Sequence, residues 1–419
     1  MNDILRFYSR RDVQKEILRI TKDREVAVCF GDKFGKRPDI IQYGSDIEEL
    51  AKQGATSFHI SVERWRNPLD LKTGLTRRQL DNLRIGFDFL IDIDSKFLEC
   101  SKITANLIVD ALKFNSIKNI SAKFSGGTGI HILVPFESFP DEVNGQRTML
   151  LFPEIPKAII EYIKNLIKPY LMEKVKNLSS LDDISKSTSI SVKDLKINNE
   201  FNPFKIIEID SQLISSRHLI RSAYSINEKT NLVSIPMDIN HIEEFNPKKA
   251  KIGNIEIKHK FFSPEDSENG EAKFLLIQAL DFAQKMARVE IKKFAQYEIP
   301  KIAIQEAYFP DCIKKLLDGV KQDGRKRAVF ILISFLQHMG WNYDEIQDLL
   351  LKWNAKNYEP LKEGYIITQI KWFKSQQKKI LPPNCDHESY YKSIGVKCFN
   401  CKCKNPVNQV KIRLGKIRK

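Results

Sequence analysis

Acidic and apolar residues alternate over residues 87–94, which read FDFLIDID. Successive side chains of a β-strand point to opposite faces. The pattern therefore predicts two groups: Phe87, Phe89, Ile91 and Ile93 on one face, and Asp88, Leu90, Asp92 and Asp94 on the other. Carboxylates held this close repel one another unless a cation neutralises them, and hard divalent ions prefer oxygen ligands. Asp92 and Asp94 thus indicate a Mg²⁺ or Mn²⁺ site, and the alternative is a strand entering a turn, with Asp94 and Ser95 capping the next helix.

A second stretch, FKIIEID, ends at Asp210 and repeats this alternation. Its apolar side chains would face one way and its acidic side chains the other. A basic segment follows at His218–Arg221, and Lys229 lies further along the chain. Three carboxylates with basic residues nearby suit in-line nucleotidyl transfer, in which two divalent ions stabilise the attacking and leaving oxygens.

The segment SGGTGIH places Ser125 before a glycine turn and His131 after it. The flanking stretches NISAKFS and IHILVPF have the composition of strands, so a β-hairpin is expected. A hydroxyl, an imidazole and exposed glycine amides together could cradle a phosphate. The alternative is an ordinary glycine hairpin with a partly buried histidine.

The elements around these residues predict an α/β fold. The order strand, helix, strand, strand over residues 87–136 is most of a split βαβ unit of the ferredoxin or RNA-recognition-motif (RRM) type. A longer helix is expected over residues 153–176, followed by a polar stretch to about residue 193 that reads as a mobile loop. Residues 263–271 are acidic and rich in turn formers, and a helix is expected from Ala272 to about Lys293.

Length and charge narrow the class of protein. The chain has 419 residues, which suggests two or three domains, and a formal net charge of +15, which favours polyanionic partners. It has no apolar run near the ~20 residues that cross a bilayer. The N-terminus lacks the apolar centre of a secretion signal. We therefore expect a cytoplasmic, nucleoid-associated protein without membrane contact.

Beyond Cys312 the sequence predicts helices and then a cysteine-rich, irregular tail whose final KIRLGKIRK is basic and loose. Five of the seven cysteines lie in this last third: Cys312, Cys385, Cys398, Cys401 and Cys403. Such spacing in an intracellular protein indicates metal binding rather than disulfides. By themselves, the last four cysteines read as a zinc knuckle with His387 as a spare ligand.

Five motifs in order resemble the catalytic small subunit of archaeal and eukaryotic-type DNA primases: REVAVCF, SVERWRNP, FDFLIDID, FSGGTGIHILV and IEIDSQLISSRHLIRSAYSINEKTNLVSIP. The resemblance implies that Asp92, Asp94 and Asp210 bind the metals. It also implies that Ser125 and His131 contact substrate phosphates and that Arg221 is the basic residue after the third aspartate.

The sequence departs from this family at two places. The family usually has two arginines where this chain has Gly127 and Thr128, and a histidine where it has Asn227. Binding of a triphosphate must then use other cations, for which the candidates are Lys123, Arg221 and Lys229. Many members also carry a zinc knob. None is expected here, because Cys29 and Cys100 alone cannot supply four ligands.

The cysteine-rich end resembles the C-terminal domain of the primase large subunit, through FPDCIKKLL, the helix after GRKR, PPNC and the closing C…KNPV. The resemblance implies a [4Fe–4S] cluster on Cys312, Cys385, Cys398 and Cys401, with Cys403 as the alternative fourth ligand. Zinc is the alternative metal. It further implies that Arg325, Lys326 and Arg327 grip the initiating triphosphate and the template. The alternative for these three residues is a solvated basic helix start.

Together the matches resemble a single-chain fused primase of the nanoarchaeal kind. We expect a primase catalytic domain with an RRM-like split βαβ core at 1–262, a helical connector at 263–305 and a small all-α iron–sulfur domain at 306–419. The expected activity is de novo synthesis of RNA or DNA primers on single-stranded DNA from NTPs or dNTPs, to start replication, by a monomer. The alternatives are a primase-polymerase that extends primers in repair or restart, and a non-catalytic nucleic-acid-binding protein.

Overall fold

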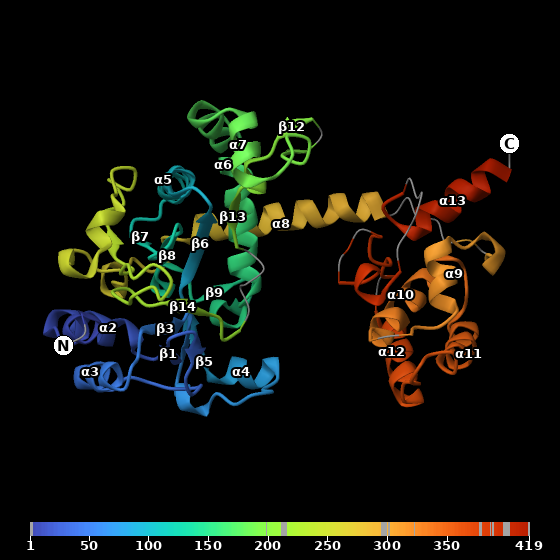
Figure 1. Cartoon of the computed structure of the whole chain (residues 1–419), viewed down its shortest axis with the longest axis horizontal. Coiled ribbons are helices and arrows are strands. Elements are labelled where there is room, and N and C mark those ends of the chain that lie inside the picture. The colour runs from blue at the N-terminus through green and yellow to red at the C-terminus, as the bar shows by residue number, and fades with distance from the viewer. Residues whose placement is uncertain are drawn as a thin grey trace. The chain divides into compact units, whose positions relative to one another are not determined.

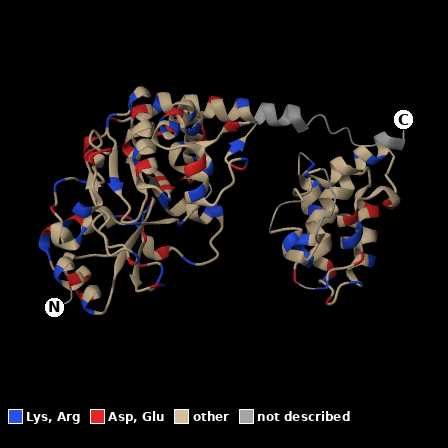
Figure 2. Cartoon of the chain, turned by 45° about the horizontal axis from the view of Figure 1, so that its top comes forward, with Lys and Arg blue, Asp and Glu red and all other residues tan. Residues whose placement is uncertain are grey.

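The chain divides into two compact units, Met1–Arg288 and Val289–Lys419, which are described separately. The computed structural model describes residues 3–197, 199–210, 216–294, 300, 302–321, 323–376, 379–385, 387, 389–396 and 403–417. The division between the units lies inside the stretch predicted as a connector. Lysine and arginine occur in both units and are interspersed with acidic residues (Figure 2).

The N-terminal unit contains a four-stranded sheet in the order β14-β3-β1-β2. Its strands are β1 (Val26–Phe30), β2 (Lys33–Phe34), β3 (Ser57–Ser61) and β14 (Leu219–Arg221). One face is apolar, because Val26, Val28, Phe58 and Ile60 are buried in the core. The preceding and intervening helices are α1 (Asp3–Tyr8), α2 (Arg11–Thr21) and α3 (Gly44–Lys52). The helices and the strands β1 and β3 lie together in the blue part of Figure 1, and β14, from later in the chain, pairs with β3.

A five-stranded antiparallel sheet carries the acidic stretches, in the order β13-β6-β8-β7-β15. Its strands are β6 (Phe89–Ser95), β7 (Ser121–Phe124), β8 (Ile130–Val134), β13 (Ile207–Ile209) and β15 (Pro236–Met237). The helices α5 (Leu98–Phe114) and α6 (Glu154–Leu178) contact each other, and both contact β6 (Figure 1). The predicted strand, helix, strand, strand order is thus present, as is the long helix after residue 153.

The alternation in residues 87–94 has the expected effect on burial. Four apolar side chains are at most 1% exposed: Phe87, Phe89, Ile91 and Ile93. The opposite face is not open along its whole length, because Asp88 is 1% and Leu90 is 8% exposed. Asp88 lies between β5 (Arg84–Phe87) and β6, where other elements cover it. The acidic face opens only from Asp92 onward.

The polar stretch after α6 is not a loop throughout, contrary to the sequence prediction. It forms α7 (Leu181–Thr188), whose N-cap residue Ser180 accepts a hydrogen bond from the backbone N–H of Asp183. Asp182 and Asp183 lie in the first turn, where negative charge favours a helix. These capping signals outweigh the polar composition.

Smaller elements complete the N-terminal unit. They are β4 (Glu63–Trp65), α4 (Arg77–Leu83), the hairpin of β9 (Glu142–Val143) and β10 (Gln146–Arg147), and the hairpin of β11 (Lys196–Ile197) and β12 (Glu200–Phe201). The helix predicted from residue 272 is α8 (Lys273–Phe294), and its first turns join the core of this unit through Leu275, Leu276 and Ala279.

The described elements of the C-terminal unit are helical, as the sequence predicts. They are α9 (Asp311–Leu317), α10 (Arg325–His338), α11 (Tyr343–Asn354), α12 (Glu363–Ser375) and α13 (Pro406–Ile417), with short 3₁₀ turns between some of them. A separate core holds them together, with Trp353, Phe335 and Leu332 fully buried. The tail predicted to be loose is instead helical through residue 417, and Val407 and Val410 anchor it in that core. Within the described residues, no helix is long and apolar enough to span a bilayer.

Candidate active site

Pairing of β13 with β6 brings the two acidic stretches together. Glu208 lies opposite Asp94, and the backbone N–H of Asp210 donates to the carbonyl oxygen of Asp92 at 3.1 Å. Asp210, one residue beyond β13, is therefore next to Asp92, although 118 positions separate them in the sequence. Asp92 and Asp210 line one small cavity together with His218.

The environments of Asp92 and Asp94 push their pKa values apart. Burial would raise the pKa of Asp92, but the adjacent His131, whose Nε2 lies 3.3 Å from Asp92 Oδ1, together with Lys123 and His218 keeps that pKa below its ordinary value.

Burial raises the pKa of Asp94, and the negative charge of Asp92 adds to the effect. Hydrogen bonds from Thr128 and from the backbone of Ser95, and the charge of His131, oppose these two effects, but the pKa of Asp94 stays above its ordinary value. A metal ion could neutralise the negative charge of this pair.

His131 lies on β8 directly opposite Asp92 in the β6–β8 register. Burial lowers its pKa, and the neighbouring Lys123 lowers it further, so the neutral imidazole is favoured. Its Nδ1 has no hydrogen-bond partner among the described residues. The neutral ring therefore carries its proton on Nε2 and donates it to Asp92, which orients the carboxylate.

The glycine turn between β7 and β8 fits closely against its surroundings. Gly126 has φ +90°, and a Cβ there would lie 2.8 Å from Cβ of Asn227. A Cβ on Gly129 would lie 2.8 Å from the carbonyl oxygen of Ile93. Gly126 thus lets the turn approach the loop of Asn227, and Gly129 lets it approach β6 beside Asp94. Asp94 Oδ1 accepts a hydrogen bond from Thr128 at 3.3 Å.

Ser125 closes this turn from inside. Its Oγ accepts hydrogen bonds from the backbone N–H groups of Gly127, at 3.3 Å, and Gly129, at 3.1 Å. The sequence predicted exposed amides as a phosphate cradle, whereas two of them are directed to Ser125 in this structure. A phosphate contacting the turn would meet the Ser125 hydroxyl at the point where those amides converge.

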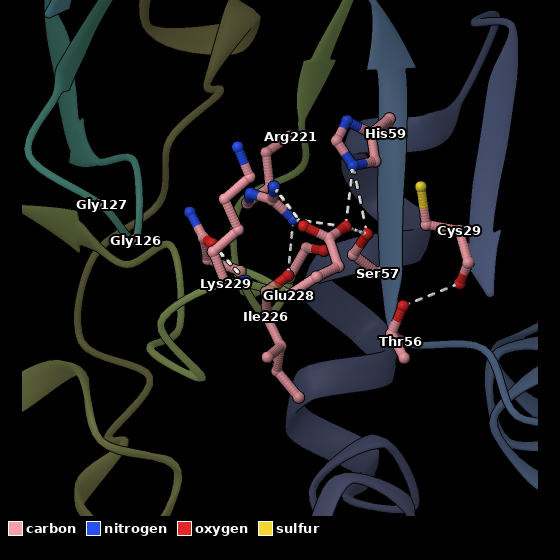
Figure 3. A network of polar contacts seen from close by, with 12 residues as sticks. Cys29, Thr56, Ser57, His59, Gly126, Gly127, Arg221, Ile226, Glu228 and Lys229 are labelled. Atoms are coloured by element: carbon pink, nitrogen blue, oxygen red, sulfur yellow. Dashed lines mark hydrogen bonds and ion pairs between the residues drawn. The ribbon is translucent and has the colours of Figure 1, made fainter. Parts of the chain in front are cut away.

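The three candidate cations for a triphosphate differ in accessibility. Lys123 is fully buried, donates to Ser234 Oγ at 2.8 Å, and has its pKa lowered to about 7 by burial and by the charge of Arg221. Arg221 is half-buried and forms an ion pair with Glu228, Nη2 to Oε2 at 2.7 Å. Lys229 is exposed, and Figure 3 places it beside Gly126 and Gly127 of the turn.

His218 is a site residue that the sequence analysis did not single out. It lies just before β14 and lines the cavity with Asp92 and Asp210. Burial lowers its pKa, opposed by the two carboxylates. In the sequence, only its position in the basic segment after Asp210 indicates a role at the site.

The carboxylate of Asp88 is held by two arginines and a backbone N–H group. Its carboxylate forms ion pairs with Arg24 and with Arg64, the latter at 3.2 Å, and it accepts the backbone N–H of Phe136 at 3.0 Å. Burial opposes ionisation, but these arginines hold the pKa of Asp88 below its ordinary value. Asp88 lines the same cavity as Asp92 and Asp210, but the two arginines hold its carboxylate, which links the start of β6 to the segment before β1 and to β4 rather than serving as a free ligand.

In the C-terminal unit the structure locates three of the predicted cluster ligands. Cys312 is buried in α9. The backbone N–H of Cys385 donates to the carbonyl oxygen of Lys404 at 2.7 Å, which brings the segment of Cys385 next to that of Cys403. Cys398 and Cys401 lie outside the described residues. His387 packs its ring against Tyr390, with centroids 5.0 Å apart.

The basic residues at the start of α10 have partners within the unit. Arg325 bonds Glu359 at 2.8 Å and lies over the ring of Tyr358, and Lys326 lies over the ring of Tyr365. Arg327 donates to the carbonyl oxygen of Ser389 at 3.0 Å. The three charges thus remain at the helix N-terminus, where backbone N–H groups also favour anions.

Two family models match this chain. The one described as DNA primase small subunit matches residues 91–239. The other, which describes the C-terminal domain of the large subunit of eukaryotic and archaeal DNA primase, matches residues 302–418. An uncharacterized protein of Methanocaldococcus jannaschii, MJECS07, is 24% identical over 353 residues, or 76% of this chain and 71% of that protein.

One similar solved structure is the polymerase domain of Mycobacterium tuberculosis Ligase D in complex with DNA. It has a TM-score of 0.35 and 12% identity over 66% of this chain and 88% of that one. This likeness is too weak to carry an argument about the fold or the site.

The class of protein follows from the two family matches: the chain is a nucleotidyltransferase of the DNA primase class. It belongs to the primases of eukaryotic and archaeal type. One polypeptide joins the sequence of the small subunit to that of the C-terminal domain of the large one.

Proposed function

We propose that this fused primase synthesises primers de novo on single-stranded DNA, with Asp92, Asp94 and Asp210 as the ligands of two divalent ions. The observation that carries the proposal is the pairing of β13 with β6, which gathers three carboxylates from distant parts of the chain. The family matches support the nucleotidyl-transfer class, and the carboxylates supply the site within it.

The residues present suit Mg²⁺ or Mn²⁺. The donors are all carboxylate oxygens, which hard cations prefer, and the raised pKa of Asp94 reflects its burial and the neighbouring charge of Asp92. When bound, the ions would stabilise negative charge on the phosphoryl group and on the attacking and leaving oxygens. Meanwhile His131 orients Asp92, Thr128 orients Asp94, and strand pairing fixes Asp210.

The triphosphate would lie at the glycine turn. Ser125 offers a hydroxyl there, and Lys229 is exposed beside it. Arg221 would reach a phosphate by exchanging its pair with Glu228. Lys123 is buried and would attract the triphosphate through its charge without contacting it. His131 would act by holding Asp92 in position. In this arrangement Lys229 and Arg221 replace the arginines that the family usually has in the turn.

The sheet supports the RRM-like core within this proposal. The chain order β6, α5, β7, β8, α6, β13 and the spatial order β13-β6-β8-β7 correspond to a split βαβ unit with its fourth strand beside the first. In such units the central strands carry the functional residues. Asp92 and Asp94 lie on the first of these strands and His131 on the third.

For the C-terminal unit we propose an iron–sulfur domain that holds the template and the initiating NTP or dNTP through Arg325, Lys326 and Arg327. The buried Cys312 and the neighbouring segments of Cys385 and Cys403 support a metal-bound cluster of cysteines, and thiolates suit both iron–sulfur and zinc centres. Iron and zinc analysis of anaerobically purified protein separates the two. A colourless protein that contains zinc and no iron would overturn the [4Fe–4S] assignment.

The test of the catalytic proposal is incorporation of labelled nucleotide on unprimed single-stranded DNA. Asp92→Asn should reduce synthesis at least ~10²-fold, because it removes a charge that acts on the reacting groups. Binding of the DNA strand should remain, and Asp110→Asn, an exposed change on α5, should keep parental activity. Full activity of Asp92→Asn would overturn the site.

Two other outcomes define the rival functions. Synthesis on primed but never on unprimed templates would replace the proposal by a primase-polymerase that extends existing primers. DNA binding without any metal-dependent incorporation would replace it by a non-catalytic binding protein.

A further inference from the structure

A second group of potential metal ligands lies outside the aspartate site. Cys29 of β1, His59 of β3 and Glu228 of the loop after β14 each present one ligand atom, and these atoms all lie within 4.8 Å of one another. Figure 3 shows the three side chains converging beside Ser57 and Arg221. In the nucleotidyl-transfer proposal Glu228 is only the resting partner of Arg221, and Cys29 and His59 have no role.

Strand register explains why these residues meet. Cys29 lies opposite Ser57 in the β1–β3 pairing, and His59 lies opposite Arg221 in the β3–β14 pairing. Since Ser57 and His59 are two residues apart, all four side chains share one face of the sheet. The other face carries the apolar core, so this polar face is distinct from it, and Glu228 reaches over it from the loop.

The distance between the His59 and Glu228 ligand atoms suits a single tetrahedral ion. His59 Nε2 and Glu228 Oε1 are 3.5 Å apart. Two ligand atoms bound to a tetrahedral Zn²⁺ at its usual nitrogen and oxygen distances are about 3.4 Å apart. Ser57 Oγ is 3.1 Å from His59 Nε2 and also bonds Glu228 Oε1. Its oxygen, or a water in its place, is available as a fourth ligand.

The charges also suit a divalent ion. Arg221 contacts both Glu228 oxygens, but the shorter contact, 2.7 Å, is to Oε2, while Oε1 faces His59 and Ser57. Glu228 can therefore bridge the guanidinium and a metal. Cys29 would bind as a thiolate. Two negative ligands then balance the ion, and Arg221 pairs with the outer oxygen of Glu228 as long as no nucleotide phosphate takes its place.

We propose that Cys29, His59 and Glu228 bind one zinc ion. The donors are sulfur, nitrogen and oxygen, a set that selects a borderline-soft ion such as Zn²⁺ over the Mg²⁺ or Mn²⁺ of an all-oxygen site. The ion would tie β1, β3 and the loop of Glu228 together. This site is separate from the aspartate site and from the cysteine-rich tail.

The loop that carries Glu228 connects the proposed zinc ion to the nucleotide site. The loop of Glu228 also carries Lys229, and Thr230 in it donates its hydroxyl to the carbonyl oxygen of Gly126 in the glycine turn. By holding Glu228, the ion would fix both the position of this loop and the distance of Arg221 from the turn. It acts as a structural clamp and takes no part in the chemical step.

The test measures zinc bound by the full-length chain, purified without a polyhistidine tag and dialysed after addition of zinc alone. Cys29→Ser and His59→Gln should each bind about one zinc ion fewer per chain than the parent. Cys100→Ser, a change at the other buried cysteine of this unit, should bind as the parent does. Any zinc in the cysteine-rich tail cancels in these differences.

Thermal unfolding gives a second readout that does not depend on activity. Added zinc should raise the Tm of the parent and of Cys100→Ser, and the rise should be lost in Cys29→Ser, because an ion that binds the folded state stabilises it. Equal zinc content in the parent, Cys29→Ser and His59→Gln would overturn the proposal. Loss of the parent's zinc on dialysis would overturn it too. Zinc content is measured apart from primer synthesis, so failure of one proposal leaves the other testable.

Discussion

The backbone N–H of Asp210 donates to the carbonyl oxygen of Asp92 at 3.1 Å. This bond continues the β13–β6 ladder one residue past the end of β13 and sets the third carboxylate beside the first. Asp210 lies outside regular secondary structure, but this backbone hydrogen bond fixes its main chain and thereby limits where its carboxylate can lie.

Asp210→Asn should therefore remove a negative charge without moving the backbone. We expect primer synthesis to fall at least ~10²-fold, because the asparagine side chain binds a divalent ion more weakly than the carboxylate does. The backbone hydrogen bond to Asp92 stays in place. Incorporation measured over a Mg²⁺ or Mn²⁺ titration tests this. Asp110→Asn is the matched control, and parental activity of Asp210→Asn at all metal concentrations would contradict the role given to Asp210.

Gly127 is a position where positive charge can be added to the turn. A Cβ at Gly127 would meet only ordinary contacts, 3.6 Å to Asn227 Nδ2 and 3.8 Å to Ser125 Oγ, and its φ is not positive. Gly127→Arg should lower the KM for nucleotide about tenfold, since a hydrogen bond to a charged group contributes roughly 1.5 kcal/mol.

The size-matched control for that change is Gly127→Gln, which adds length without charge. It should leave the KM near the parental value. If the arginine and glutamine variants have the same KM, the triphosphate does not lie at this turn.

Local patterns in the sequence predicted the strands and helices that frame the site. The alternation at 87–94 predicted β6, and the glycines at 126 and 129 predicted the turn. Fold class and helix positions depend mainly on such short-range patterns. The prediction of a loop after residue 178 was wrong because Ser180 and two aspartates form a helix start, which composition alone does not reveal.

Side-chain contacts between distant segments could not be predicted from the sequence, because they depend on long-range strand pairing. Asp88 follows the same alternation as Asp92, yet its carboxylate is buried against Arg24, which precedes β1, and Arg64 of β4. The sequence around Cys29 contains no obvious second ligand, but the β1–β3 strand register places Cys29 near His59 and Glu228. Such contacts depend on which strands become neighbours, and spacing along the chain does not specify this.

Asp88→Asn should destabilise the N-terminal unit by about 3 kcal/mol or more, because it leaves Arg24 and Arg64 buried without their counter-charge. The pKa of Asp88 is lowered in the folded state, so its contribution is present above the ordinary pKa of aspartate, near 4, and is lost as pH falls through the folded value.

Urea denaturation at pH 7 and at low pH checks both statements. The stability difference between parent and Asp88→Asn should be large at pH 7 and shrink as the solution is acidified. The surface change Asp110→Asn should show little difference at either pH. A difference that stays constant with pH would mean that Asp88 is held by its size and hydrogen bonds rather than by its charge.

Lys123 gives rise to a second pH dependence of stability, in a higher pH range. Burial, with the charge of Arg221, lowers its folded-state pKa to about 7, whereas an unfolded lysine titrates near 10.4. Between these values the unfolded chain binds more protons, so the contribution of Lys123 to stability rises with pH. Lys123→Met removes the charge and keeps the apolar chain.

The variant should therefore gain stability relative to the parent at pH 7, and this relative gain should diminish as pH rises toward about 10.4, because above that value Lys123 is neutral in both states. Urea denaturation at pH 7, 8.5 and 10 measures the difference, with the exposed Lys176→Met as control. A pH-independent difference would mean that Lys123 stays charged when buried. Its ammonium would then be held by Asp92 and remain available to a triphosphate, so the same experiment decides whether Lys123 counts among the cations of the nucleotide site.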